Sequence, residues 1–171
     1  MFEKNNSFIF RKLPVGNELE LYRPRKKKVF LHIPDLFNDS KIYRISESAF
    51  ANRRIFSLSL GKNILHISVD AFKNCIYLKK LHIPSNVKVI ERRAFFNCKR
   101  LKKVVIDDGC HHLGRNAFKN CISLKDVYLP KSIGHIDDTT FMNCPNLILH
   151  CPKDSYAEKY AQNNNLRYTN N

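Results

Sequence analysis

The sequence predicts an α/β solenoid, a right-handed superhelix of about five to six repeats of 22 to 23 residues with a parallel sheet on its concave face. Two observations predict it. An Ala-Phe pair recurs at residues 49, 71, 94 and 117, and Thr140-Phe141 continues the series. A short strand pattern, L-x-I, follows these pairs at a nearly constant distance. One such unit cannot bury its own apolar side, so stacked units must share one core, and we expect a single domain.

The first 28 residues precede the repeats, and we expect residues 1–28 to form an N-terminal capping segment. Gly16-Asn17 separates two apolar runs in FIFRKLPVGNELELY, a pattern that favours a β-hairpin. Such a hairpin would protect the open first edge of the solenoid. We interpret residues 23–28, RPRKKK, as a solvated linker, with nuclear import or nucleic-acid contact as the alternatives.

The repeats occupy residues 29–151. VFLHIP at 29–34 matches LHIP at 81–84, and the residues from Asp35 to Ser40 predict a loop inserted into a partial first repeat. In each regular copy the alanine and phenylalanine pack inward, and the cysteine acts as a small buried hydrophobic residue. The asparagine is expected to bond backbone groups that a tight turn leaves unpaired. The convex side is expected to hold mostly irregular or short helical segments.

Residues 152–171 are predicted to form a C-terminal cap. Ser155 is followed three residues later by Glu158, which is the spacing of a helical capping box. Four side chains recur four residues apart and are expected to cover the last coil, namely Tyr156, Ala157, Tyr160 and Ala161.

Each regular copy reads A-F-x-N-C-x-x-L-x-x-L-x-I-P-x-x-V-x-x-I. This pattern resembles the Treponema-type, or BspA-like, leucine-rich repeat family, whose units carry an I-x-x-x-A-F-x-x-C-x-x-L phrase. The resemblance covers about residues 29 to 168. It implies a curved solenoid used for binding, often at bacterial or protist surfaces, and it implies no catalytic residues.

The charge is strongly basic and concentrated in the repeats. There are 30 Lys and Arg residues against 15 Asp and Glu, a formal net charge of +15. Because side chains alternate along a strand, residues beside the inward Leu and Ile face the open side of the sheet. The candidate partner-binding residues on that side are Lys79, Lys80, His82, Lys102, Lys103, Val105, Lys125 and Tyr128. We expect Arg53-Arg54 and Lys99-Arg100 to flank this stripe.

Chemical motifs are weak. No C-x-x-C pair occurs, and Cys110-His111-His112 is the one local Cys/His cluster, without a visible fourth ligand, so no metal site is predicted. The cysteines of the repeat column point the same way and are expected to stay reduced, with Cys144 and Cys151 as the pair to check. No nucleophile motif, phosphate loop or dinucleotide fingerprint occurs, so we predict no enzyme, no catalytic residue and no cofactor.

We therefore expect a non-enzymatic protein-interaction module that binds a partner with an acidic surface. Nucleic-acid or other polyanion binding is the alternative, weakened because aromatic residues are sparse along the stripe, with Tyr128 alone in its middle. The third interpretation is a solvated basic surface without a partner. No membrane span or signal peptide is visible, so the chain as written is expected in the cytoplasm, and at the cell surface or secreted if a leader was removed. The oligomeric state stays open.

Overall fold

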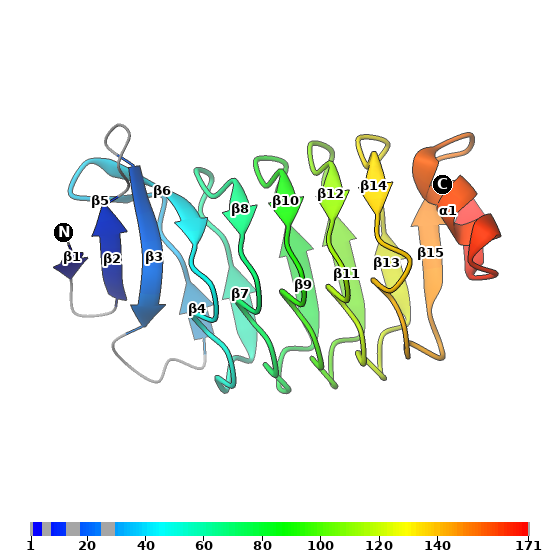
Figure 1. The fold of residues 1–171 in the computed structure, drawn as a ribbon, viewed down its shortest axis with the longest axis horizontal. Helices are drawn as coiled ribbons and strands as arrows, with labels where there is room; N and C mark the ends of the chain where they lie inside the picture. The colour runs from blue at the N-terminus through cyan, green and yellow to red at the C-terminus, as the bar shows by residue number, and fades with distance from the viewer. Residues whose placement is uncertain (1, 5–7, 13–17, 25–29, 171) are drawn as a thin grey trace.

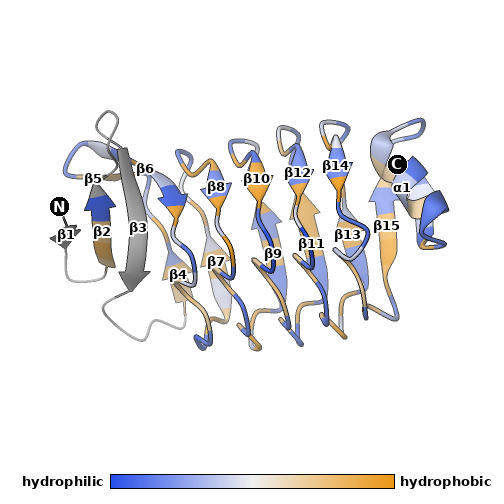
Figure 2. Ribbon diagram, in the orientation of Figure 1, coloured by the Kyte–Doolittle hydropathy of each residue, from blue (hydrophilic) through white to orange (hydrophobic). Residues whose placement is uncertain are grey.

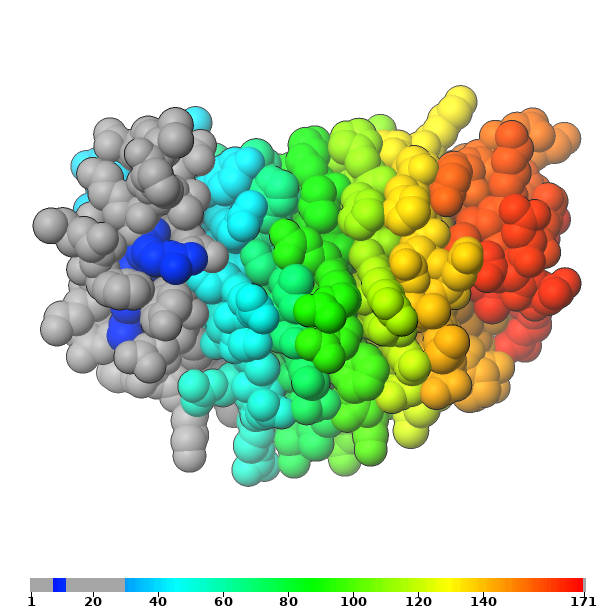
Figure 3. Space-filling model, in the orientation of Figure 1, coloured from blue at the N-terminus to red at the C-terminus, as the bar shows by residue number. Residues whose placement is uncertain are grey.

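The computed structural model of the chain describes residues 2–4, 8–12, 18–24 and 30–170. Its repeats form a row of coils that follow one another along the long axis, with the two ends of the chain at opposite ends of the row (Figure 1). The coils pack side by side in chain order (Figure 3). Parallel strands from successive coils pair with one another, which confirms the predicted solenoid.

One side of the coils carries the longer strands. They form a parallel sheet in the order β16-β15-β13-β11-β9, and a parallel pair, β4-β7, precedes it. Side chains alternate along β9, where Leu81 and Ile83 are buried while Lys80 and His82 are exposed. This alternation confirms the predicted orientation of the repeat strand. The bounds are β4 (Phe30–His32), β7 (Ser57–Ser59), β9 (Lys80–Ile83), β11 (Lys103–Ile106), β13 (Asp126–Tyr128), β15 (Ile148–Cys151) and β16 (Arg167–Asn170).

A second ladder lies on another side of the coils, where the sequence predicted irregular or short helical segments. It runs from β6 through β8, β10 and β12 to β14, all parallel, and most of its strands have only two residues. The rest of each described repeat consists of turns and irregular segments, as expected, and the only helix in the described part of the chain is C-terminal. The bounds are β6 (Ser40–Ile45), β8 (His66–Ile67), β10 (Val89–Ile90), β12 (His112–Leu113) and β14 (His135–Ile136).

The N-terminal strands extend this second sheet. They are β1 (Phe2–Lys4), β2 (Phe8–Lys12) and β3 (Glu18–Pro24). β2 and β3 pair antiparallel, as the predicted hairpin requires, and β3 then pairs parallel with β6. The turn at 13–17 lies outside the described residues. Of the basic segment 23–28, residues 23 and 24 end β3, and the remainder also lies outside the described part, so its interpretation as a linker stays a prediction.

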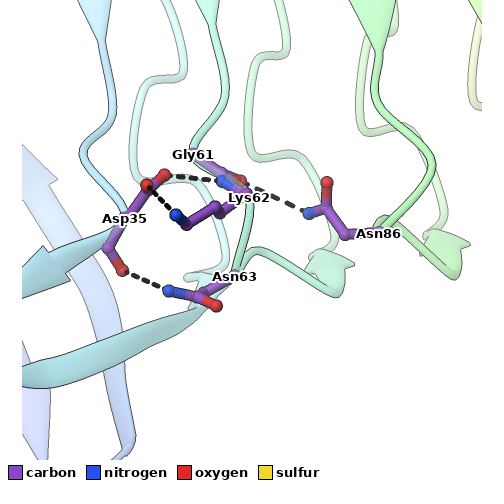
Figure 4. A network of polar contacts seen from close by, with 5 residues as sticks. All are labelled: Asp35, Gly61, Lys62, Asn63 and Asn86. Carbon is purple, nitrogen blue, oxygen red and sulfur yellow. Dashed lines mark hydrogen bonds and ion pairs between the residues drawn. The ribbon is translucent and has the colours of Figure 1, made fainter.

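The inserted segment of the first coil is a small hairpin. β5 (Leu36–Phe37) folds back antiparallel on β6, and Asn38 and Asp39 turn the chain with φ values of 48° and 59°. Asp35 fastens this insertion to the next coil (Figure 4). Its Oδ1 accepts from the backbone N–H of Lys62 at 2.7 Å, and its carbonyl oxygen accepts from the side chain of Asn63 at 3.1 Å. The inserted residues therefore depart from the repeat pattern but stay hydrogen-bonded to the next coil.

The core is a column of stacked rings. Phe50, Phe72, Phe95, Phe118 and Phe141 lie at the same place in successive coils, with ring centroids 5.1 to 5.6 Å apart and planes within 9° of parallel. Two rings from outside the column close its ends edge-on, Phe8 of β2 on Phe50 and Tyr160 on Phe141. Apolar residues recur at matching places in each coil (Figure 2). The repeated phenylalanines are thus one of several buried apolar columns that join successive coils.

The asparagine of each copy sets the turn that follows the phenylalanine. Asn52, Asn74, Asn97, Asn120 and Asn143 all have φ between 59° and 63°, a left-handed conformation that asparagine tolerates better than most residues. Their side chains bond one another rather than backbone groups, as in the 2.7 Å bond from Asn74 Nδ2 to Asn52 Oδ1. These bonds join Asn52, Asn74 and Asn97 in one series and Asn120 with Asn143 in another, in place of the predicted bonds to the backbone.

The C-terminal cap is α1 (Tyr156–Asn163) followed by β16. Ser155 accepts from the backbone N–H of Glu158 at 3.2 Å, which confirms the first half of the capping box. The Glu158 carboxylate accepts from the N–H of Asp154, one residue before the cap. Ala157, Tyr160 and Ala161 are buried against the last coil, as expected. Tyr156 is 39% exposed, so its predicted role in covering the coil is wrong.

Candidate protein-binding face

The eight residues singled out in the sequence lie together on the sheet of longer strands. We call them the lysine face: Lys79, Lys80, His82, Lys102, Lys103, Val105, Lys125 and Tyr128. Within the sheet, Lys80 pairs with Lys103, and His82 pairs with Val105, which in turn pairs with Tyr128. The backbones of Lys79, Lys102 and Lys125 are joined by hydrogen bonds of 2.8 and 3.0 Å. One lysine column therefore spans three coils, through Lys79, Lys102 and Lys125, and a second lies beside it over two coils, through Lys80 and Lys103.

The lysines of this face are exposed and lack anionic partners. All five are exposed, and none forms an ion pair with any residue that the structure describes. Adjacent strands of a sheet lie about 4.8 Å apart, a spacing at which like charges on neighbouring strands repel. Lys103 relieves part of this repulsion by placing its ammonium group over the Tyr128 ring, 4.5 Å from the centroid.

Histidines and carboxylates also lie on or beside the face, and they make it less basic toward its C-terminal end. His150 contacts Asp126 at 3.0 Å and stacks on Tyr128 with ring centroids 4.2 Å apart. His82 contacts Asp107 at 2.8 Å. Asp126 also takes the place that Lys80 and Lys103 hold in the two preceding coils. Positive charge is thus concentrated on β9, β11 and the residues just before them, and Val105 and Tyr128 are half-buried between the lysines and the core.

The predicted arginines at the edge of the stripe contribute to a cluster that the sequence did not reveal. Arg54 and Arg100 both lie over the ring of Tyr77, 5.0 and 5.2 Å from its centroid. Phe56 stacks on the same ring, and Phe30 contacts Phe56. Part of the signal lies in the repeat register, because Phe56 stands where the next copy has Lys79, but the register does not show the ring contact itself.

The cysteine thiols are buried in the core, and two of the histidine rings stack on each other. All six cysteines are free and buried. Burial raises the pKa of Cys75 and Cys144 to about 12 and that of Cys110 to about 11, which removes the thiolate at neutral pH. His112 stacks on His135 with centroids 4.7 Å apart, and burial together with that neighbour lowers its pKa. Among the described residues, no three His, Cys, Asp or Glu side chains are grouped to hold a metal ion.

Comparison with known families decides the relationship. The description "BspA type leucine rich repeat region" matches residues 32–148 in six copies. The chain belongs to the BspA type leucine-rich repeat family. The match confirms the resemblance read from the repeat and the number of coils. Leucine-rich repeat proteins are in general non-enzymatic protein-interaction modules.

Solved structures share the BspA type fold. A leucine-rich repeat protein of Treponema pallidum superposes with a TM-score of 0.77 at 23% identity, over 86% of this chain and 70% of that one. A leucine rich cell surface protein of Faecalibacterium prausnitzii superposes with a TM-score of 0.72 at 21% identity, over 91% of this chain and 46% of that one. The pneumococcal vaccine antigen PcpA superposes with a TM-score of 0.73 at 16% identity, over 99% of this chain and 47% of that one.

This chain spans about half the length of the last two proteins. Comparison with curated proteins finds no significant match. Within the described residues, no helix has the length and apolar character that crossing a bilayer requires.

Proposed function

We propose that the chain is a protein-interaction module that binds an acidic surface of a partner protein through the lysine face. One observation carries the proposal: five lysines on adjacent coils are exposed and without a carboxylate partner among the described residues. An aligned column of like charges costs folding free energy, and an anionic partner would remove that cost. Electrostatic complementarity of this kind speeds association and selects partners.

The test measures binding of short anionic probes to the lysine face. Fluorescein-labelled oligoglutamate of 20 residues, double-stranded DNA of 20 base pairs and heparin are titrated with the native chain at 50 and 150 mM NaCl. The variant Lys79→Ser/Lys80→Ser/Lys102→Ser/Lys103→Ser removes four charges from the face. Its matched control, Arg92→Ser/Lys131→Ser/Lys153→Ser/Lys159→Ser, removes four charges from exposed residues outside it.

Binding of oligoglutamate that weakens with salt, is lost in the lysine-face variant and survives in the control supports the proposal. Equal losses in both variants would mean that net charge alone drives binding, which contradicts a specific face. Binding of DNA and heparin without oligoglutamate would move polyanion recognition into first place, since phosphate contacts fall steeply with salt.

A further inference from the structure

A second surface begins where the lysine face ends. We call Phe30, Arg54, Phe56, Tyr77 and Arg100 the aromatic–arginine cluster. Its rings form a continuous chain across three coils, with centroids 6.5 Å apart from Phe30 to Phe56 and 5.0 Å apart from Phe56 to Tyr77. Because Phe56 occupies the column of Lys79 and Lys102, the cluster is continuous with the lysine face.

Two of the three rings of this cluster are exposed. Phe30 is 72% exposed and Phe56 is 40% exposed, although both contact a further ring. Ile76, beside Tyr77 in the chain, is another exposed apolar residue. Isolated exposed apolar side chains are common, but a contiguous set marks an interaction surface, because covering it removes apolar area from water.

A hollow beside Tyr77 is lined by cationic side chains and favours an anionic group of a partner. It measures about 320 Å³ and is lined by Asn52, Arg53, Arg54, Asn74, Ile76, Tyr77, Asn97 and Lys99. Three of these side chains are cationic and none is a carboxylate. The asparagine amides in its wall bond one another at 2.7 Å, so their geometry is fixed. The hollow is therefore a preformed, positively charged concavity next to an apolar ridge, and an acidic side chain complements it.

The ring geometry favours a peptide over a nucleic acid strand. Arg54 from the coil before and Arg100 from the coil after both lie over the Tyr77 ring, and Phe56 stacks on it, so this ring is already occupied by three neighbours. Single-stranded nucleic acids bind by stacking bases on free aromatic faces. A peptide requires no free ring face, since aliphatic or aromatic side chains pack against ring edges and carboxylates pair with arginine forks.

We propose that the aromatic–arginine cluster docks an acidic peptide segment of the partner that carries a large apolar side chain among its carboxylates. The apolar side chain covers Phe30 and Phe56, and neighbouring carboxylates reach Arg54, Arg100 and the hollow. This inference rests on the proposed function, because the lysine face then receives the remaining acidic residues of the same partner. The cluster supplies the apolar anchor that a purely basic surface lacks.

The experiment compares two labelled peptides of 14 residues with equal net charge. One contains six Glu residues with Gly and Ser, and the other replaces two of the Gly residues with Leu and Phe. A polyadenylate strand of 14 nucleotides is the third probe. Each is titrated into the native chain, into the lysine-face variant Lys79→Ser/Lys80→Ser/Lys102→Ser/Lys103→Ser, into Arg54→Ser/Phe56→Ser/Arg100→Ser, and into the control Arg92→Ser/Arg115→Ser/Ile122→Ser. The control removes two exposed arginines and one exposed apolar residue elsewhere. Circular dichroism of each variant checks that it is folded.

We expect the apolar–acidic peptide to bind the native chain at least tenfold more tightly than the purely acidic one. The cluster variant should abolish that difference, and the control should keep it. Equal binding of both peptides, lost only when the lysine face is changed, overturns this inference and leaves the proposed function standing. Failure of both peptides to bind overturns both proposals. Preference for polyadenylate that depends on the cluster also overturns this inference in favour of nucleic acid.

Discussion

The side-chain amide of Asn97 donates a 2.7 Å hydrogen bond to the side-chain oxygen of Asn74, one coil earlier. Both residues are left-handed, with φ of 60° and 59°. The asparagine column therefore has two functions, since it makes the turn after each phenylalanine and ties that turn to the preceding coil. Substitutions at one position separate these two contributions.

Replacing Asn97 with alanine removes the hydrogen bond and places a β-carbon in the left-handed region. We expect a loss of roughly 2–3 kcal/mol in the free energy of unfolding, from about 1 kcal/mol for the bond and 1–2 for the backbone. Asn97→Gly keeps the turn and should lose only about 1 kcal/mol. Urea unfolding of the two variants measures the difference. Equal losses would show that the backbone conformation costs nothing here.

Gly109 tolerates no side chain. Its φ is 122°, and a β-carbon at this position would lie 2.2 Å from the carbonyl oxygen of Ser85. Gly109→Ala is expected to lower the free energy of unfolding by roughly 2–3 kcal/mol. Gly134→Ala is the matched control, because its β-carbon would meet nothing closer than 3.9 Å, and it should change stability by less than about 1 kcal/mol. Thermal unfolding in which both variants match the native protein would refute the expected clash.

The buried thiols predict a loss of stability in alkali. Burial raises the pKa of Cys75 and Cys144 from 9.0 to about 12, so the folded state holds these protons more tightly than the unfolded state. Their stabilising contribution is complete below pH 9 and is lost as the pH rises from about 9 toward 12. Urea midpoints measured across this range should fall, and they should fall less steeply in Cys75→Ala/Cys144→Ala. An unchanged slope in the variant would assign the alkaline loss to other groups.

Asp154 leads into the C-terminal helix with a φ of 59°. Aspartate adopts this conformation less readily than glycine. The backbone N–H of residue 154 donates to the Glu158 carboxylate, and a glycine at this position would keep that bond. Asp154→Gly is therefore expected to stabilise the fold by less than about 1 kcal/mol, because the greater entropy that glycine loses on folding offsets part of the gain. Asp154→Ala should not stabilise it, since alanine is no better in this region. Differential scanning calorimetry distinguishes the two, and a lower midpoint for the glycine variant would contradict the argument.

The sequence predicted the columns because each one repeats at a fixed distance. Phe72, Phe95 and Phe118 pack inward as expected, and the alternation in β9 placed Lys80 and His82 on the open side. The second sheet escaped prediction because two-residue strands leave no alternating pattern to read. Their pairing is a property of stacked coils and not of any single segment.

The lysine face could be predicted from the sequence, whereas the aromatic–arginine cluster could not. Lysines in one column are visible by counting residues along the sequence. The contact between Phe56 and Tyr77 joins two different columns. Ring contacts across columns depend on side-chain length and direction, which the repeat spacing does not specify. The role of both surfaces in binding is a prediction for the experiments above.

The ring column with a different closing residue at each end makes the fold modular. Phe8 and Tyr160 cover the outermost rings, and every internal phenylalanine offers its neighbour an equivalent stacking surface. Removing a whole 23-residue unit, such as 94–116, would bring Phe118 against Phe72 without a new kind of contact. Each added unit would lengthen the surface by one strand spacing, about 4.8 Å. The reach of the molecule can thus evolve by duplication of units, independently of the chemistry displayed on any one of them.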